Sequence, residues 1–364
     1  MSDLQAKIQA IADQLVCEGV ERGLQFAAYY RGELIANTFA GVANHLTGEK
    51  VDENTLFPVF STTKGMAATV IHRLVDRGQL AYDEPLSKIW PEFAAEGKGA
   101  ITLRQALNHS AGLPHMPKGI GYGDMCDWTK MCSLIASMKP LWTPGTRIEY
   151  HAITYSWTVC EVACRVTGLA FPELIRKEIC EPLGLSTMFV GLPEELQSRV
   201  AILEENVPDP PPPDDQTQAV PWWIGPLHSM MNRPDARRAC IPASNGIMNA
   251  MAIAKHYAAL LHCGLNGVEL LSPERLREVT EPQKPDFPES EDYSRTQGLG
   301  YMLGEPGSIY GETSRAFGHS GYGGSTGFAD PETGLAVGFT RNLYKDQPTT
   351  RMLMDVLRTN CGAS

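Results

Sequence analysis

Phe60-Ser61-Thr62-Thr63-Lys64-Gly65 carries more chemical information than any other stretch of this 364-residue chain. It places a hydroxyl and an amine three residues apart at the predicted start of a helix, where positions i and i+3 share one face. If burial or a nearby cation keeps the Lys64 amine neutral, that amine can accept the Ser61 proton and activate the oxygen. The alternative interpretation is an N-cap serine that opens an amphipathic helix with a solvated lysine.

The bulk composition is that of an ordinary globular protein. The chain is 43% hydrophobic and 20% charged, so it can bury a large core in one big domain or in two closely packed ones. Its net charge is -11, from 31 Lys and Arg against 42 Asp and Glu. Because no basic run offsets this deficit, the charge argues against nucleic acid or an anionic membrane as a partner.

The N-terminal residues and the cysteines bear on the cellular compartment. Leu4, Ile8, Ile11 and Leu15 predict an amphipathic helix, with no basic segment followed by an apolar one as in secretory signals. No apolar window approaches the ~20 residues needed to span a bilayer. Nine cysteines without a C-x-x-C pair suit reduced thiols better than a disulfide framework or a zinc site. We therefore expect a cytoplasmic protein, although a processed export product would also lack a signal sequence.

Predicted strands occupy both ends of the chain and predicted helices its middle. Two apolar runs, 24–30 and 33–40, flank Arg31-Gly32, which is a β-hairpin signal. Four short strands are expected near the C-terminus, at 298–304, 316–321, 325–330 and 335–341, with a turn at 330–334 between the last two. Helices are expected at 4–22, 61–77, 86–95, 102–109, 153–167, 171–181, 246–263 and 348–360.

This order of elements predicts an α+β fold. An antiparallel sheet is built from the N- and C-terminal strands and flanked by helices, with an all-helical insertion between them. We expect a discontinuous α/β domain over 1–80 and 240–364 and a mostly helical domain over 81–239. The proline-rich segment 207–215 predicts an exposed loop that serves as a connector or a lid. Trp222-Trp223 follow it and either shape a ligand pocket or anchor the loop to the core.

Two further motifs can complete a site around Ser61. A Ser-Lys pair needs a second proton relay for the leaving group, and Tyr150 is a candidate because it lies between a Pro-Gly turn and a predicted helix. His319-Ser320-Gly321 lies on a predicted edge strand, where a glycine lets a substrate lie alongside the backbone. The N-H of Tyr322 can then point at a developing oxyanion, together with the N-H of Ser61 at a helix N-terminus.

Three motifs, in this order and at these separations, resemble those of class C β-lactamases and the related family VIII carboxylesterases: Ser61-Thr62-Thr63-Lys64, Tyr150-His151-Ala152 and His319-Ser320-Gly321. Supporting matches lie at 107–114, 144–146, 182–185 and 327–331, and the resemblance extends from about residue 5 to 360. It implies a β-lactamase/transpeptidase-like fold with the active site in the cleft between the sheet and the helical region. It also implies that Ser61 is the nucleophile, Lys64 its general base and Tyr150 the proton shuttle.

Two positions depart from the lactamase pattern, which usually has Tyr-x-Asn and Lys-Thr-Gly. Ala152 replaces the Asn and cannot hydrogen-bond a substrate amide, a contact worth about 0.5–1.5 kcal/mol. His319 replaces the Lys that would help to bind a lactam carboxylate, and an imidazole is largely neutral at pH 7. Both changes favour ester hydrolysis or acyl transfer over the cleavage of lactams or peptides.

Other candidates receive smaller roles. We expect His319, Ser320, Gly321, His151, Ala152, Trp222 and Trp223 to contact the substrate, and residues 116–127 and 208–231 to build the pocket walls. Gly323-Gly324-Ser325-Thr326-Gly327 fits G-x-S-x-G, but that motif needs a strand, a turn and a helix, whereas strand, turn and strand are predicted here. No His, Cys, Asp or Glu grouping has metal-ligand spacing, so we expect neither a metal nor a cofactor.

The leading hypothesis is a serine carboxylesterase that forms an acyl-enzyme on Ser61, with a small-molecule ester or acyl donor of small to medium chain length as its partner. An acyltransferase (transesterase) of secondary metabolism on the same fold is the main alternative, and the sequence does not separate the two. β-Lactamase and D-aminopeptidase are weaker alternatives. A non-catalytic binding or scaffold protein is a different class, against which the intact Ser61, Lys64 and Tyr150 argue. The oligomeric state, a homo-oligomer included, stays open.

Overall fold

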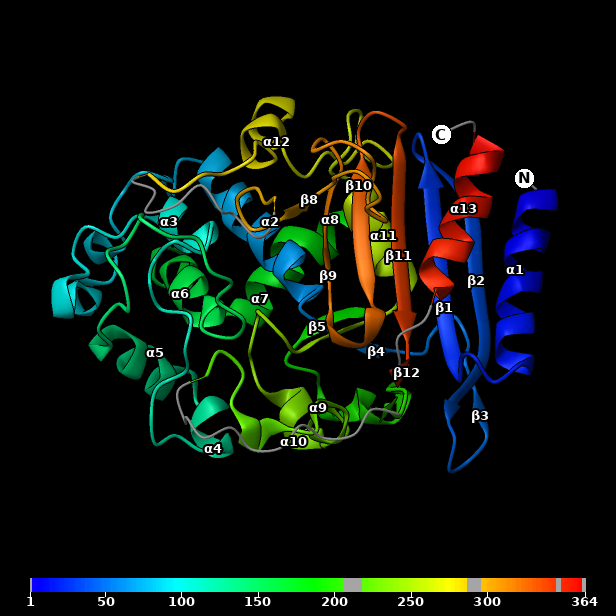
Figure 1. Cartoon of the computed structure of the whole chain (residues 1–364), viewed down its shortest axis with the longest axis horizontal. Helices are drawn as coiled ribbons and strands as arrows, with labels where there is room; N and C mark the ends of the chain where they lie inside the picture. The colour runs from blue at the N-terminus through cyan, green and yellow to red at the C-terminus, as the bar shows by residue number, and fades with distance from the viewer. Residues whose placement is uncertain (1, 206–217, 287–295, 345–347, 362–364) are drawn as a thin grey trace.

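A seven-stranded antiparallel sheet joins the two ends of the chain in the computed structural model, which describes residues 2–205, 218–286, 296–344 and 348–361 (Figure 1). The strand order is β3-β2-β1-β11-β10-β9-β8. The N-terminal half meets the C-terminal half where β1 pairs with β11, with Leu24 opposite Arg341. The predicted α+β fold, with a sheet built from both termini, is confirmed. The strands span β1 Gly23–Tyr30, β2 Glu33–Asn44, β3 Glu49–Lys50, β8 Met302–Leu303, β9 Phe317–Ser320, β10 Thr326–Asp330 and β11 Leu335–Arg341.

Local turn chemistry connects these strands as predicted. Arg31 and Gly32 both have positive φ, 50° and 81°, as the central residues of a tight two-residue hairpin turn do. At the other end, the Gly334 N-H donates to the carbonyl of Asp330 at 2.8 Å and closes the turn between β10 and β11. Both predicted turns are therefore confirmed.

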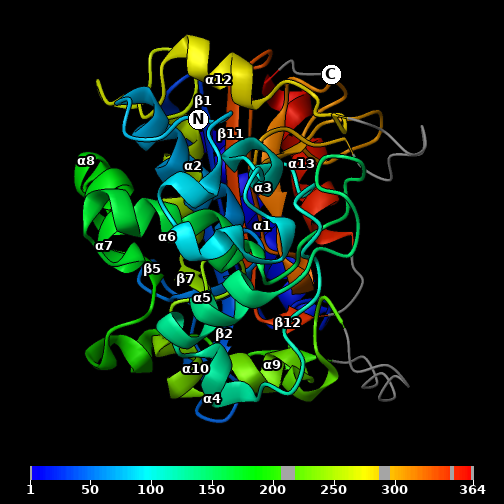
Figure 2. The ribbon, with the colours of Figure 1, turned by 90° about the vertical axis from the view of Figure 1, so that its left-hand side faces the viewer.

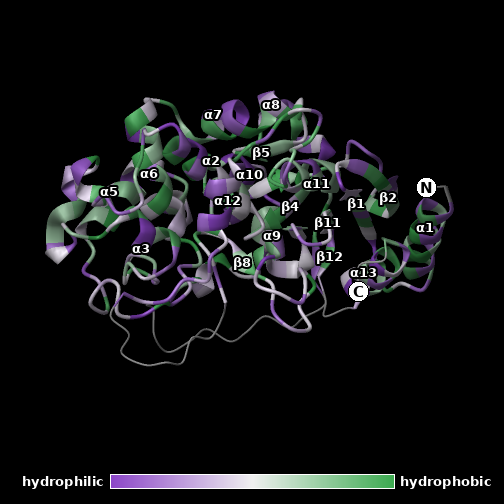
Figure 3. Cartoon of the chain, turned by 90° about the horizontal axis from the view of Figure 1, so that it is seen from above, coloured by the Kyte–Doolittle hydropathy of each residue, from purple (hydrophilic) through white to green (hydrophobic). Residues whose placement is uncertain are grey.

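Helices cover both faces of the sheet. α1 (Ser2–Cys17) and α13 (Thr349–Cys361) lie on one face, and α11 (Ala250–Ala258) lies on the other (Figure 1). Successive side chains of a strand point to opposite faces, so Phe26 packs with the α1 and α13 residues while Ala27 belongs to the larger core that includes α11. Figure 3 shows hydrophobic and hydrophilic segments alternating along α1, as in an amphipathic helix.

Two small sheets lie beside the main one. In the first, β4 (Phe57–Phe60) pairs with β7 (Gly246–Met248), which pairs with β5 (Met188–Val190). In the second, β6 (Glu204–Glu205) pairs in parallel with β12 (Leu343–Tyr344). The helix predicted over 246–263 is therefore wrong at its start, because residues 246–248 pair as β7. The helix begins only after Asn249, whose side chain caps it by accepting the N-H of Ala252 at 2.8 Å.

The residues between β4 and α11 are mainly helical and face the viewer in Figure 2, in front of the sheet. The helix predicted at 86–95 is wrong: the chain forms short 3-10 turns there, since Pro85 and Pro91 interrupt the backbone hydrogen bonding. The helices and turns outside the sheet faces are α2 Thr63–Asp76, η1 Leu86–Lys88, η2 Pro91–Gly97, α3 Leu103–Leu107, α4 Tyr122–Met125, α5 Trp128–Ser137, α6 Tyr155–Thr167, α7 Phe171–Ile175, η3 Arg176–Cys180, α8 Glu181–Leu183, η4 Glu194–Arg199, η5 Trp222–Ile224, α9 Leu227–Met231, α10 Pro234–Arg238, α12 Pro273–Val279 and η6 Tyr322–Gly324.

The predicted division into two domains stays a prediction. The largest hydrophobic cluster includes Ala27 of β1 and Ile253 of α11 together with Trp157 of α6, so one core runs across the predicted boundary. The proline-rich segment 207–215 lies outside the described residues. Within the described ranges, no helix has the length and apolarity that crossing a bilayer requires.

Candidate active site

Ser61 lies at a sharp turn between a buried strand and a buried helix. β4 ends at Phe60, whose φ of 46° is a left-handed conformation that a bulky residue rarely adopts. The Thr62 N-H donates to the carbonyl of Val59 at 3.1 Å, and the Lys64 N-H donates to the carbonyl of Ser61 at 3.0 Å. α2 therefore starts two residues after Ser61, and the strained turn presents the Ser61 side chain at the end of the strand.

Lys64 is fully buried, with its amine directed at Ser61. Its Nζ lies 3.3 Å from Ser61 Oγ, 2.7 Å from the carbonyl oxygen of Ala152 and 2.8 Å from that of Ala243. Burial lowers the pKa of Lys64 well below its ordinary value of 10.5, because the ammonium form loses its hydration. The solvated lysine of the alternative interpretation is therefore not observed.

Tyr150 comes close to the same amine from the loop before α6. Lys64 Nζ lies 4.8 Å from the centroid of the Tyr150 ring. The ring also packs against His109, with centroids 4.9 Å apart, and against His319 at 6.1 Å. The structure thus brings together Ser61, Lys64, Tyr150 and His319, which are separated by up to 258 residues in sequence.

His319-Ser320-Gly321 passes the Ser61 turn at the end of β9. A Cβ added at Gly321 would lie 2.0 Å from the carbonyl oxygen of Val59, so only glycine lets the two segments approach this closely. His319 Nδ1 lies 2.8 Å from the carbonyl oxygen of Ser320 and donates to it. Ser320 Oγ forms hydrogen bonds with two other hydroxyl groups, that of Tyr310 at 2.7 Å and Thr326 Oγ1 at 2.9 Å.

These motifs surround a cavity of about 360 Å³. Seven of the predicted site residues contribute to its lining, namely Ser61, Tyr150, Ala152, His319, Ser320, Gly321 and Tyr322. The rest of the lining is almost entirely apolar and consists of Phe60, Met125, Ile153, Val220, Ile224, Leu227, Met230, Ser244 and Met302. No lysine or arginine side chain is part of this lining, so the cavity suits a neutral, apolar group.

Three predicted contact residues lie outside this lining. His151 is buried behind it, where its Nε2 accepts the Leu113 N-H at 2.9 Å and its Nδ1 donates to the carbonyl of Glu149 at 2.6 Å. Burial lowers the pKa of His151 to about 4. Trp222 is half exposed and Trp223 packs against the main core, while the next residue, Ile224, is the one that lines the cavity. The structure therefore does not bring these three side chains to the cavity.

The apolar wall residues carried no individual signal in the sequence. Met125, Val220, Ile224, Leu227 and Met230 fall within the ranges expected to build the walls, but periodicity could not tell them from core residues. Ser244 and Met302 were missed entirely. Ser244 could have been suspected only from its neighbour Ala243, whose carbonyl contacts Lys64, and that contact depends on the fold.

Ser325, the serine of the G-x-S-x-G match, is structural. Its side chain is buried and donates to the carbonyl of Val59 at 2.7 Å. It also lies 3.2 Å from Thr62 Oγ1, and β10 follows it instead of a helix. The predicted strand-turn-strand context is confirmed, and Ser325 ties the strand that precedes Ser61 to the sheet.

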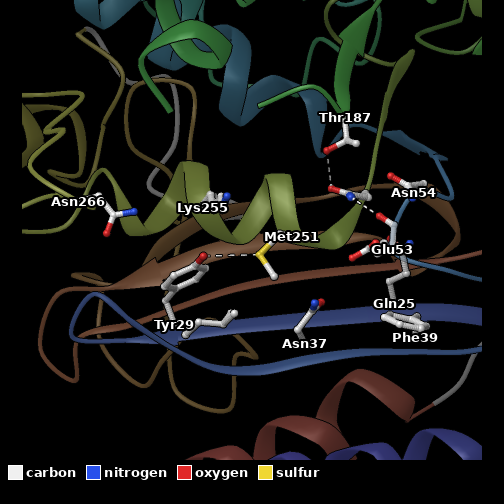
Figure 4. A pocket seen from close by; sticks show the side chains of 12 residues that line it. Gln25, Tyr29, Asn37, Phe39, Glu53, Asn54, Thr187, Met251, Lys255 and Asn266 are labelled. Atoms are coloured by element: carbon white, nitrogen blue, oxygen red, sulfur yellow. Dashed lines mark hydrogen bonds between the residues drawn. The ribbon is translucent and has the colours of Figure 1, made fainter. Parts of the chain in front are cut away.

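A second cavity of about 400 Å³ lies between the β1-β2 hairpin and α11 (Figure 4). Its polar side chains largely bond to one another or to the backbone: Thr187 Oγ1 donates to Asn249 Oδ1 at 3.0 Å, and Asn249 Nδ2 donates to the Glu53 carbonyl at 2.9 Å. The Tyr29 hydroxyl lies 3.6 Å from Met251 Sδ. No nucleophile-base pair occurs among its lining residues. Within the described part of the chain, no group of three or more His, Cys, Asp or Glu side chains is arranged to hold a metal ion.

The chain is similar to several known proteins in sequence and in fold. A family model described as Beta-lactamase matches residues 9–357. "Esterase/beta-lactamase LipL" of Mycobacterium tuberculosis is 32% identical over 340 residues, which cover 88% of this chain and 77% of that protein. A penicillin-binding protein homologue from Caulobacter crescentus is 34% identical, with a TM-score of 0.85 over 98% of this chain and 97% of its own. A family VIII carboxylesterase is 31% identical, with a TM-score of 0.88 and the same coverage.

Proposed function

Because the chain belongs to the beta-lactamase family, we propose that it is a serine hydrolase that forms an acyl-enzyme on Ser61 and hydrolyses carboxylic esters of small to medium acyl groups. The observation that carries the proposal is the buried Lys64 amine, 3.3 Å from Ser61 Oγ. A neutral amine has two N-H donors and one lone pair. The carbonyls of Ala152 and Ala243 accept the two N-H bonds, which leaves the lone pair for the Ser61 proton.

Acylation follows from this arrangement. The Ser61 hydroxyl proton moves to Lys64 Nζ while Oγ forms a bond to the ester carbonyl carbon, and the carbonyl π electrons move to oxygen. The backbone N-H groups of Ser61 and Tyr322 donate to that oxyanion. When the tetrahedral species collapses, the bond to the alcohol oxygen breaks and the leaving group takes up a proton through Tyr150. The acyl group then remains on Ser61 Oγ.

Deacylation reverses these roles with water as the nucleophile. One water proton passes through Tyr150 to Lys64 as the water oxygen attacks the acyl carbon. When the tetrahedral species collapses, the bond from the acyl carbon to Ser61 Oγ breaks and Oγ takes that proton back from Lys64. The carboxylic acid is released. The apolar lining supports an acyl or alcohol group of several carbons, because each buried methylene contributes about 0.8 kcal/mol of binding.

Ester turnover in a Ser61→Ala variant tests this proposal. We expect hydrolysis of p-nitrophenyl butyrate to fall at least about 10³-fold, since the nucleophile is lost. Ser133→Ala, on the exposed side of α5, is the matched control and should retain wild-type activity. A fluorophosphonate probe, followed by peptide mass spectrometry, should label Ser61 in the wild type. Retained turnover in Ser61→Ala, or labelling elsewhere, would refute the assignment.

Acyl transfer to an alcohol is the second candidate. A cavity of about 360 Å³ lined mainly by apolar side chains can hold an alcohol beside a short acyl group, and such an acceptor would compete with water for the acyl-enzyme. Product partition measures this: butyrate and butyl butyrate are quantified during turnover of p-nitrophenyl butyrate with added butanol. Predominant ester formation at millimolar butanol would favour the transferase, and unchanged butyrate release would favour the hydrolase.

A further inference from the structure

A cluster of three aromatic rings lies behind the two N-H groups proposed to bind the oxyanion. The rings of Phe60, Tyr322 and Tyr344 meet edge to face, with centroids 5.6, 5.8 and 5.9 Å apart. Phe60 directly precedes Ser61, which carries one proposed donor, and Tyr322 carries the other. The distance between the two donors therefore depends on how these rings pack.

Tyr344 fixes this cluster to the rest of the site. Its hydroxyl donates to the carbonyl of Pro58 in β4 at 3.2 Å. A Cβ added at Gly323 would lie 2.4 Å from the Tyr344 ring, so the turn that carries Tyr322 lies directly on that ring. The ring side of Tyr322 is thus well supported. Its hydroxyl is supported by a different residue.

Glu205 accepts the Tyr322 hydroxyl on Oε1. The Glu205 side chain is only 6% exposed, and its second oxygen lies 3.0 Å from His228 Nδ1. Because an ionised carboxylate can only accept, Nδ1 carries the proton in this contact. The other ring nitrogen, Nε2, lies 3.1 Å from Ser229 Oγ.

This carboxylate links two parts of the cavity. His228 lies on α9 between Leu227 and Met230, both of which line the cavity wall. Tyr322, which carries one of the proposed oxyanion donors, lines the same cavity. Ser229, His228 and Glu205 also follow the order of a Ser-His-acid triad. Ser229 is exposed and is not among the lining residues, so we assign it no nucleophilic role.

We propose that Glu205 is a positioning residue whose carboxylate holds the Tyr322 turn and helix α9 at fixed positions relative to each other. The same carboxylate thereby sets both the position of the oxyanion donor on Tyr322 and the length of acyl group that the cavity accepts. This inference rests on the proposed function. It adds a specificity device that none of the three sequence motifs contains. Glu205 touches neither the substrate nor Ser61; it acts through Tyr322 and His228.

Substitution of Glu205 separates this role from general stability. We expect Glu205→Ala to lower kcat about 10- to 100-fold on p-nitrophenyl acetate, since small misplacements of a catalytic group have effects of this size. KM should rise with chain length from acetate to octanoate, because α9 loses its tie. Glu205→Gln keeps one carbonyl oxygen for the Tyr322 hydroxyl and should recover activity to within about fivefold of wild type.

Glu204→Gln is the matched control. The Glu204 side chain pairs with Arg22 at 2.9 Å and His45 at 3.2 Å and takes no part in the Tyr322 contact. This variant should keep the wild-type kcat and chain-length profile. If Glu205→Ala does not fold, Tyr322→Phe carries the test: it removes the hydroxyl contact and should lower kcat, whereas Glu205→Gln keeps an acceptor for that hydroxyl and should not.

A double-mutant cycle gives the decisive result. Tyr322→Phe removes the hydroxyl but keeps the ring and the N-H, so the combination with Glu205→Ala should cost no more than the larger single loss. Independent, multiplying losses would overturn the proposal, as would a Glu205→Ala profile equal to that of Glu204→Gln. The rate at which a fluorophosphonate labels Ser61 distinguishes a failure of the proposed function from a failure of the positioning role. No labelling in the wild type refutes the proposed function itself, whereas normal labelling of every variant refutes only the positioning role.

Discussion

Lys64 shows how its surroundings decide what a single residue can do. Its amine contacts two carbonyl oxygens and one hydroxyl. These neutral dipoles replace the water that would hydrate the ammonium form, and none of the three carries a negative charge. Burial therefore lowers the pKa of this lysine well below 10.5 and makes the free base available nearer to neutral pH. The same amine in solvent would be protonated and unable to accept the Ser61 proton.

The pH dependence of ester hydrolysis reports on Lys64. A general base is active only when deprotonated, so kcat/KM should rise with pH through the lowered Lys64 pKa and level off below pH 10.5. Lys64→Arg keeps a permanent positive charge and should reduce kcat/KM about 10²- to 10⁴-fold. The control is Lys118→Arg at an exposed position, which should leave the profile unchanged. A rate that climbs without levelling up to pH 10.5 would contradict the assignment.

We expect His319 and Ala152 to make the protein a poor catalyst of lactam hydrolysis. The cavity lining has no lysine or arginine, so an anionic lactam lacks a charged partner. We expect poor nitrocefin hydrolysis by the wild type. The double variant His319→Lys, Ala152→Asn should improve nitrocefin kcat/KM about 30-fold, since one ion pair and one amide hydrogen bond each contribute about 1 kcal/mol. The single Ala152→Asn variant is the control for the amide alone, and no gain in the double variant would refute this explanation.

The residues proposed for catalysis could be picked out individually from the sequence, whereas the wall residues of the cavity could be predicted only as ranges or not at all. Ser61, Lys64 and Tyr150 form motifs whose chemistry is specific, and the structure brings them together. Ile224 and Met302 line the cavity but have the same apolar character as any core residue. Which of them faces a cavity is decided by packing between distant segments, and that information is not local.

At the scale of elements, the site depends on close approach between β4 and the end of β9. Ser325 donates to the Val59 carbonyl, and Gly321 lies against the same carbonyl oxygen. The left-handed Phe60 follows immediately and turns the chain toward Ser61. These contacts hold the turn at Ser61 against the end of β9.

Gly321→Ala tests this approach. Its Cβ would lie 2.0 Å from the Val59 carbonyl oxygen, so the two segments must separate. We expect a loss of about 1–3 kcal/mol in the free energy of unfolding and a larger relative loss of kcat, because the oxyanion donors move apart. Chemical denaturation and ester kinetics measure the two effects. Gly99→Ala, where the nearest atom lies 3.7 Å from the added Cβ, is the control and should be close to neutral.

Element boundaries were predicted well where local chemistry decides them. The Arg31-Gly32 hairpin and the 330–334 turn have residues suited to their conformations, and both were found. The helix predicted at 86–95 was wrong because prolines interrupt it and only short 3-10 turns form. The helix predicted at 246–263 was wrong at its start because residues 246–248 pair with β4 and β5 as strand β7. Strand pairing is a tertiary interaction, and helical spacing in one segment cannot reveal it.

At the scale of the whole molecule, three fully buried histidines couple stability to pH. Burial lowers the pKa of His72 and His256 to about 3 and that of His151 to about 4. His72 shows why the neutral form is favoured: its Nε2 donates to the Leu299 carbonyl at 2.9 Å, and its Nδ1 accepts the Tyr82 hydroxyl at 2.8 Å. A second proton has no acceptor in this arrangement.

Acid should therefore destabilise the protein before its carboxylates protonate. Between about pH 4 and 6.5 the unfolded chain binds protons that the folded chain does not, so stability falls as pH falls, by up to about 1.4 kcal/mol per pH unit for each histidine. We expect a clearly lower Tm at pH 5 than at pH 7.5. His256→Gln should reduce this difference, whereas His262→Gln at an exposed site should not. Equal Tm differences in all three proteins would contradict this account.

The pairing of β1 with β11 has a consequence for synthesis on the ribosome. Leu24 emerges more than 300 residues before its partner Arg341, so the central sheet cannot be completed until nearly the whole chain has been translated. Until then the nascent β1-β2 hairpin exposes an unpaired edge, which is a template for aggregation. Expression at lower temperature or with a chaperone that shields such edges should therefore raise the soluble yield more than any change within the active site.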